Sequence, residues 1–96
     1  MADEDDVLTK CKIGLGLSTE ANEAIDGLIT QKIATVKALL IQGGVAEEKL
    51  TTQSAIGVIT MGVTDIWEVR AGEAHFSPAF IMLATQLAMG WRHASR

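Results

Sequence analysis

The spacing of hydrophobic residues along the chain predicts helices from one end to the other. Between Ile25 and Leu40, large aliphatic side chains recur every three or four positions, which places them on one face of an amphipathic helix. Shorter stretches with the same spacing lie near both ends, and a longer apolar stretch lies between them. The pattern predicts an all-α fold, a small bundle of about four helices at residues 3–13, 19–42, 52–71 and 78–90.

The stretch over residues 55–69 is the longest apolar run and contains the first of two tryptophans. It is apolar nearly all round, so its helix is expected in the middle of the bundle or at a subunit interface. A short buried strand over residues 56–63 is the alternative, because many residues there are β-branched. The spacing of the following acidic residues favours the helix. Trp67 is expected to be buried against one side of the second helix, formed by Leu28, Ile29 and Val36.

Residues that favour helix ends mark where the helices begin and stop. Ser18 is the expected N-cap of the second helix, and the glycine pair at residues 43–44 is expected to end that helix. Ser77 followed by Pro78 predicts the start of the last helix. After the last helix, residues 91–96 are expected to form a short basic tail.

The first predicted helix, residues 3–13, is short and has a narrow apolar edge made by Val7, Leu8 and Cys11. A helix of this length is only marginally stable unless it docks on something. We therefore expect it to be mobile unless a neighbouring subunit holds it, with this edge facing the neighbour.

Two glycines, Gly57 and Gly62, lie inside the predicted central helix. Each costs that helix roughly 1 kcal/mol relative to alanine. A close helix crossing would offset this cost, because glycine lets two backbones approach. We therefore predict that both glycines are helix contact sites.

Charge is unevenly distributed along the chain. Lys and Arg number 8 against 12 Asp and Glu, a formal net charge of −4, and four of the acidic residues lie at positions 3–6. The remainder is neutral, which argues against a nucleic-acid binder, because such proteins need clustered basic residues to neutralise phosphates. Hydrophobic residues make up 48% of the chain. This is more apolar surface than one small core readily hides, and it indicates self-association.

Nothing in the sequence indicates secretion or insertion into a membrane. A single cysteine excludes an intrachain disulfide, and an acidic start is the opposite of a secretory signal. No apolar run approaches the roughly 20 residues that a bilayer-spanning helix needs.

Catalytic and ligand-binding patterns are weak. His75 and His93 share no metal-ligand spacing with each other or with Cys11. The G-x-G within residues 12–18 lacks a preceding strand and a third glycine, so helix-end and turn glycines explain it better than a phosphate loop does. We expect no enzyme activity, cofactor or metal site.

Four segments together carry a resemblance to a known family. They are CKIGLGL at residues 11–17, IATVKAL at 33–39, VITMGVTDIW at 58–67 and GEAHFSPAFIMLATQLA at 72–88. The most specific part is the run G-E-x-x-F-S-P-x-F followed by T-Q-L. Across almost its whole length, the chain resembles the small head-to-tail connector proteins of tailed bacteriophages, also called adaptor or head completion proteins.

The resemblance implies a structural protein of the virion rather than an enzyme. Members of the family are helical, assemble in the host cytoplasm and form a homo-oligomeric ring, expected to be dodecameric, at the head-tail interface beneath the portal protein. The ring extends the channel through which DNA passes without sequence-specific binding, and it receives the next stopper or tail-completion protein. The tail implied to grip the portal contains Trp91, Arg92 and Arg96. The predicted subunit-interface residues are Val7, Leu8, Cys11, Gly57, Gly62 and Arg70.

Two other classes of function compete with the connector. A small helical DNA-binding or regulatory interaction module is the first alternative, but no predicted helix is basic enough to be a recognition helix. A small helical enzyme is the second, and it lacks a catalytic constellation.

Overall fold

The computed structural model of the chain describes residues 2–67 and 76–94. Within these residues there are four α-helices and no strand, so the predicted small all-α bundle is confirmed and the alternative strand over residues 56–63 is wrong. The elements are α1 (Ala2–Gly14), α2 (Glu23–Gln42), the 3-10 helix η1 (Glu47–Thr51), α3 (Gln53–Ile66) and α4 (Pro78–Ala94).

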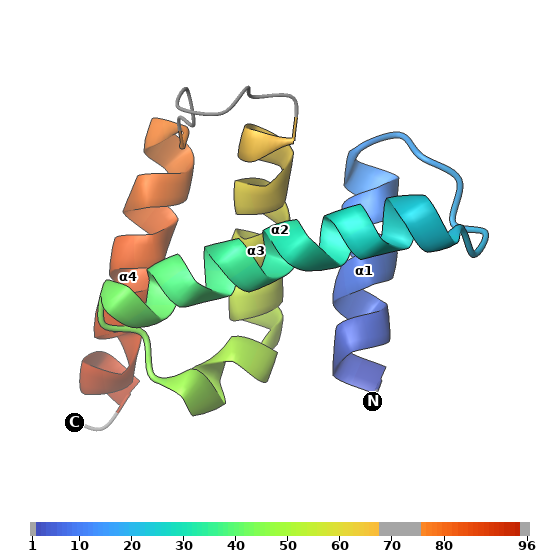
Figure 1. The fold of residues 1–96 in the computed structure, drawn as a ribbon. Helices are drawn as coiled ribbons and strands as arrows, with labels where there is room; N and C mark the ends of the chain where they lie inside the picture. The colour runs from blue at the N-terminus through green and yellow to red at the C-terminus, as the bar shows by residue number, and fades with distance from the viewer. Residues whose placement is uncertain (1, 68–75, 95–96) are drawn as a thin grey trace.

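The helices form two layers (Figure 1). Helices α1, α3 and α4 lie side by side with α3 in the middle, and α2 crosses over them. The extents of 44 × 32 × 18 Å are those of a thin slab, because its shortest dimension is less than the combined width of two helices with their side chains, roughly 20 Å. One side of the layer formed by α1, α3 and α4 is therefore covered by α2, and the opposite side is left without a helix from the described part of the chain.

The core lies where α2 crosses α3. Residues spaced three or four apart on each helix are buried, as the amphipathic pattern of α2 and the apolar character of α3 predict. Each large aliphatic side chain buried here stabilises the fold by roughly 1.5–3 kcal/mol. The buried residues are Ile29, Ile33, Val36 and Leu40 of α2, and Ala55, Ile56, Val58, Ile59, Gly62, Val63 and Ile66 of α3.

Helix α1 docks on its own chain, which corrects the expectation that its apolar edge faces a neighbouring subunit. Val7 is 2% exposed and Cys11 is fully buried, and both belong to the core, while Leu8 is partly buried against that core. These three apolar residues are enough to dock α1 because the helix packs against both α2 and α3.

A buried lysine fastens the connection between α1 and α2. Lys12 is almost fully buried, donates a hydrogen bond from Nζ to the backbone carbonyl of Glu20 at 2.9 Å, and forms an ion pair with Asp26. Asn22, in place of the expected Ser18, is the N-cap of α2, and its side chain accepts a hydrogen bond from the backbone N–H of Ile25 at 3.1 Å. Helix α2 therefore begins four residues later than predicted, after the segment that Lys12 binds.

Helix α2 ends at a glycine pair, whereas α3 ends without one. Gly44, with φ of 106°, lies in the region that favours glycine, so the glycine pair ends α2 as predicted. Helix α3 ends at Ile66, and the rest of the range predicted for it, residues 68–71, lies outside the described residues.

Trp67 at this end is only partly buried, and Leu28 is 42% exposed. Deep burial of Trp67 against Leu28 was therefore a wrong expectation, because Leu28 lies on the solvent side of α2.

The ion pair of Lys12 predicts how stability depends on pH. Its hydrogen bond and charge hold the pKa of the Asp26 carboxyl below its usual value. A carboxyl whose folded pKa is depressed stabilises the fold fully above its unfolded pKa, about 3.9, and loses that contribution as pH falls through the folded pKa. We expect Asp26→Asn to have a lower melting temperature than the natural chain at pH 6 and a progressively smaller deficit below about pH 4. Thermal melts followed by circular dichroism check this. A deficit that stays constant down to pH 2 would contradict it.

Candidate protein-interaction surface

Helix α4 carries a surface without charge. From Pro78 to Met89 the sequence contains no charged residue. One side of the helix packs on the core through the buried Phe80 and partly buried neighbours. The opposite side, here called the outer face of α4, consists of Ile81, Met82, Thr85 and Met89. Its three large apolar residues are 56%, 55% and 47% exposed in sequence order. Clustered exposed side chains of this kind are typical of an interaction site.

The start of α4 is fixed by hydrogen bonds from its N-cap. The Ser77 hydroxyl accepts a hydrogen bond from the backbone N–H of Phe80 at 3.1 Å. The Asp65 carboxylate on α3 accepts two more at 2.9 Å, one from the backbone N–H and one from the hydroxyl of Ser77. The sequence signal Ser77–Pro78 is thus a true helix start, and Asp65 ties that start to α3.

Gly62 lets α4 approach α3 closely. A Cβ placed on Gly62 would lie 2.6 Å from Cε1 of Phe80 and 2.9 Å from Cγ1 of Val36, so no side chain fits there. Phe80 fills the space, and Phe76 stacks on it with ring centroids 4.4 Å apart. Gly62 is therefore the predicted close-contact glycine. Its contacts lie within one chain, which corrects its assignment to a subunit interface.

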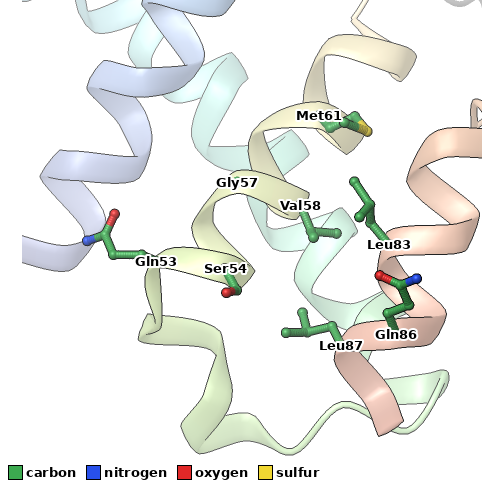
Figure 2. Close-up of a pocket in the computed structure, with 8 residues that line it drawn as sticks. All are labelled: Gln53, Ser54, Gly57, Val58, Met61, Leu83, Gln86 and Leu87. Carbon is green, nitrogen blue, oxygen red and sulfur yellow. The ribbon is translucent and has the colours of Figure 1, made fainter. Parts of the chain in front are cut away.

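An open groove runs between α3 and α4 (Figure 2), with a volume of about 520 Å³. Of the described residues that line it, none is charged. We call it the α3–α4 groove, and its lining residues are Gln53, Ser54, Gly57, Val58, Met61, Leu83, Gln86 and Leu87.

Gly57 lies in this groove rather than against another helix. A Cβ on Gly57 would meet no atom within 4 Å. Gly57 precedes Gly62 by five residues, which at 3.6 residues per turn rotates it by about 140° around α3. Gly62 contacts α2 and α4, so Gly57 is turned toward the side of the layer that α2 leaves uncovered. Gln53 points across to α1 in Figure 2, where its Oε1 accepts a hydrogen bond from Lys10 at 3.2 Å.

A second hollow, of about 150 Å³, lies on the other side of α4. It is lined by residues near the end of α2 and by α4, namely Leu39, Leu40, Gly43, Val45, Phe80, Ile81, Ala84 and Thr85. Helix α4 is therefore flanked by a hollow on each side and exposes an apolar outer face. This is a loosely covered helix for so small a chain.

The predicted tail lies partly within α4, which continues to Ala94. Trp91 and Arg92 thus occupy helical positions, and the expectation that a separate tail begins at residue 91 is corrected. Their side chains, and all of Arg70 and Arg96, lie outside the described residues.

Met82, Met89 and the groove residue Gln86 did not figure among the predicted interface residues. The absence of charge from Pro78 to Met89 was the available signal. Which face of α4 is left open is decided by the packing of Phe80 on Gly62, residues far apart in the sequence.

Other chemistry is sparse in the part of the chain that the structure describes. Residues 2–67 and 76–94 contain no group of three or more His, Cys, Asp or Glu side chains able to hold a metal ion. Among the same residues, no helix has the length and apolar character needed to cross a membrane. Burial raises the pKa of the Cys11 thiol, an effect partly offset by a hydrogen bond with Thr60, so Cys11 is a protonated core residue.

Comparison with known proteins found no matching protein family, no matching curated protein and no matching solved structure.

The two glycines of α3 predict opposite effects of the same substitution. Gly57→Ala should stabilise the fold by up to about 1 kcal/mol, because alanine favours a helix and the added methyl meets no atom. Gly62→Ala should destabilise it by about 1–3 kcal/mol despite the same helical preference, because the methyl overlaps Phe80 and Val36. Urea unfolding of the two variants beside the natural chain measures both effects. Equal shifts in the same direction would show that Gly62 is not a close-contact site.

Proposed function

We propose that this chain is a structural subunit of a head-to-tail connector ring in a tailed bacteriophage. The observation that carries the proposal is the uncharged α4, with its apolar outer face and the open α3–α4 groove beside it. A surface of this kind is suited to permanent contact with other protein subunits.

The resemblance to connector proteins supports the proposal independently of the surface. Its most specific part runs from residue 72 to residue 88 and includes the N-cap Ser77, the anchor Phe80 and much of the outer face of α4. The segment with the strongest family signal thus overlaps the segment that most needs a partner.

In the proposed virion, the subunits form a homo-oligomeric ring, dodecameric by resemblance, beneath the portal protein. The ring extends the DNA channel, takes no part in sequence-specific DNA binding, and receives a stopper or tail-completion protein on its other side. The chain acts through assembly, without catalysis or a cofactor. It assembles in the host cytoplasm and resides at the head-tail interface.

Native mass spectrometry and electron microscopy of the purified chain, alone and with the portal protein from the same phage genome, test this function. We expect a closed ring, at least on the portal. A chain that remains monomeric and does not bind the portal contradicts the proposal. Retention on duplex DNA at 0.15 M salt under the same conditions would favour a DNA-binding module instead.

The C-terminal end predicts a separation of folding from portal binding. Deleting residues 91–96 should leave the chain folded, because every buried hydrophobic residue identified in the structure precedes residue 81. It should abolish portal binding, because a tryptophan beside arginines is the composition enriched at interface hot spots. Circular dichroism melts measure folding, and co-purification with the portal measures binding.

A full-length triple variant, Trp91→Ala, Arg92→Ala and Arg96→Ala, is the matched control. It retains the chain length and removes only the side chains, so loss of binding in both variants assigns the role to those side chains. Undiminished portal binding by the truncated chain would end this assignment.

A further inference from the structure

We propose that the outer face of α4 of one subunit packs into the α3–α4 groove of a second copy of this chain. The inference rests on the proposed ring and names the contact that builds it. One subunit contributes the outer face of α4 to the boundary, and its neighbour contributes the α3–α4 groove.

The two surfaces match in charge. The described lining of the groove is uncharged, and so is the outer face of α4. Burying the two against each other removes no charged group from water, so the large penalty for burying an unpaired charge does not arise. Helix α2 also exposes Leu28, Leu39 and Ile41, but Lys32 and Lys37 lie between the first two of these. A second copy of the chain therefore supplies a suitable occupant through α4.

The two surfaces also match in length. Met82 and Met89 are separated by two helical turns, about 10.5 Å along α4. The α3 side of the groove extends from Gln53 to Met61, about 12 Å along that helix. Gly57 lies halfway and would meet no atom within 4 Å, so an incoming side chain can approach the α3 backbone there. Methionine is flexible enough to fill an irregular groove.

This contact joins two different surfaces. A heterologous contact repeats from copy to copy and closes into a ring when the rotation between copies divides a full circle. An isologous pairing of two outer faces of α4 would instead give a dimer and leave the groove empty. Repeated from copy to copy, the contact between groove and outer face builds the proposed ring, whereas the same contact made reciprocally by two copies gives a closed dimer.

Cysteine cross-linking between copies tests the contact directly. Ser54→Cys places a thiol in the groove, and Thr85→Cys places one on the outer face of α4. The two variants are purified separately, mixed at high concentration and treated with a flexible bismaleimide. We expect linked dimers at least about tenfold more abundant in the mixture than with either variant alone. Cys11 is fully buried in the chain and should contribute no background, which the natural chain verifies.

The matched control replaces Thr85→Cys by Thr30→Cys, an exposed threonine-to-cysteine change on α2. The mixture of Ser54→Cys with Thr30→Cys should give no excess of linked dimers. An equal yield from the two mixtures overturns the proposal, as does equally efficient linking of Thr85→Cys to itself.

Filling the groove gives a second, independent test. Gly57→Leu places a side chain where an added Cβ meets no atom, so the fold should tolerate it while the groove is blocked. Gly27→Leu on α2 is the matched control, because Gly27 is also exposed, helical and without any atom within 4 Å of an added Cβ. We expect Gly57→Leu to lower the assembled fraction by at least about tenfold and Gly27→Leu to leave it unchanged, with both melting as cooperatively as the natural chain.

The outcomes separate this contact from the proposed function. Rings that survive Gly57→Leu overturn the contact and leave the connector ring standing. Cross-linking between groove and outer face in a chain that native mass spectrometry finds only as a closed dimer supports the contact and overturns the ring.

Discussion

The arrangement of the helices depends on the absence of a side chain at Gly62. An added Cβ there would lie 2.6 Å from Phe80 and 2.9 Å from Val36, so α2, α3 and α4 meet at this one position. Phe80 is consequently the main anchor of α4, and the hydrogen bonds from Ser77 to Asp65 fix the start of that helix. Beyond Phe80, α4 packs on the core through partly buried side chains such as Leu83 and Leu87, while its opposite side is exposed. The same contact that places α4 therefore leaves its outer face and the neighbouring groove open.

Helix α1 is held on the core by a few specific contacts. Helix α1 uses Val7 and Cys11 to dock on the core, and Lys12 closes the connection to α2 with its ion pair to Asp26. Because Lys12 is buried, losing its carboxylate partner would leave a buried charge without compensation, so the ion pair favours one path for this connection. Helices α1, α2 and α3 thus all pack against one another. Helix α4 differs from them in exposing three large apolar residues within a stretch that contains no charged residue, which is why the proposed assembly is built on it.

Hydrophobic periodicity sufficed to predict the four helices and the all-α fold, because a 3.6-residue repeat specifies which face of each helix is buried. It could not specify what covers that face. Gly57 and Gly62 are the same residue type in the same helix, yet one lines an open groove and the other lies under Phe80. Likewise, Ser18 and Asn22 are both good N-caps, and the cap is Asn22, just after the backbone of residue 20 is bound by the side chain of Lys12 from α1. Contacts between segments far apart in sequence settled each of these choices.

Charge is distributed unequally between the two edges of the helical layer, and this distribution bears on the proposed contact between copies. Four of its twelve acidic residues lie at positions 3–6, within α1, and α1 occupies the edge of the layer opposite α4 (Figure 1). Contacts that bring two α1 helices together would oppose like charges, and such contacts are unfavourable at low ionic strength. Contacts made through α4 keep the acidic helices of adjacent copies apart and desolvate no charge on that helix from Pro78 to Met89. The acidic residues at positions 3–6 thus lie on the helix at one edge of the layer, and the proposed contact uses the uncharged stretch of the helix at the other edge.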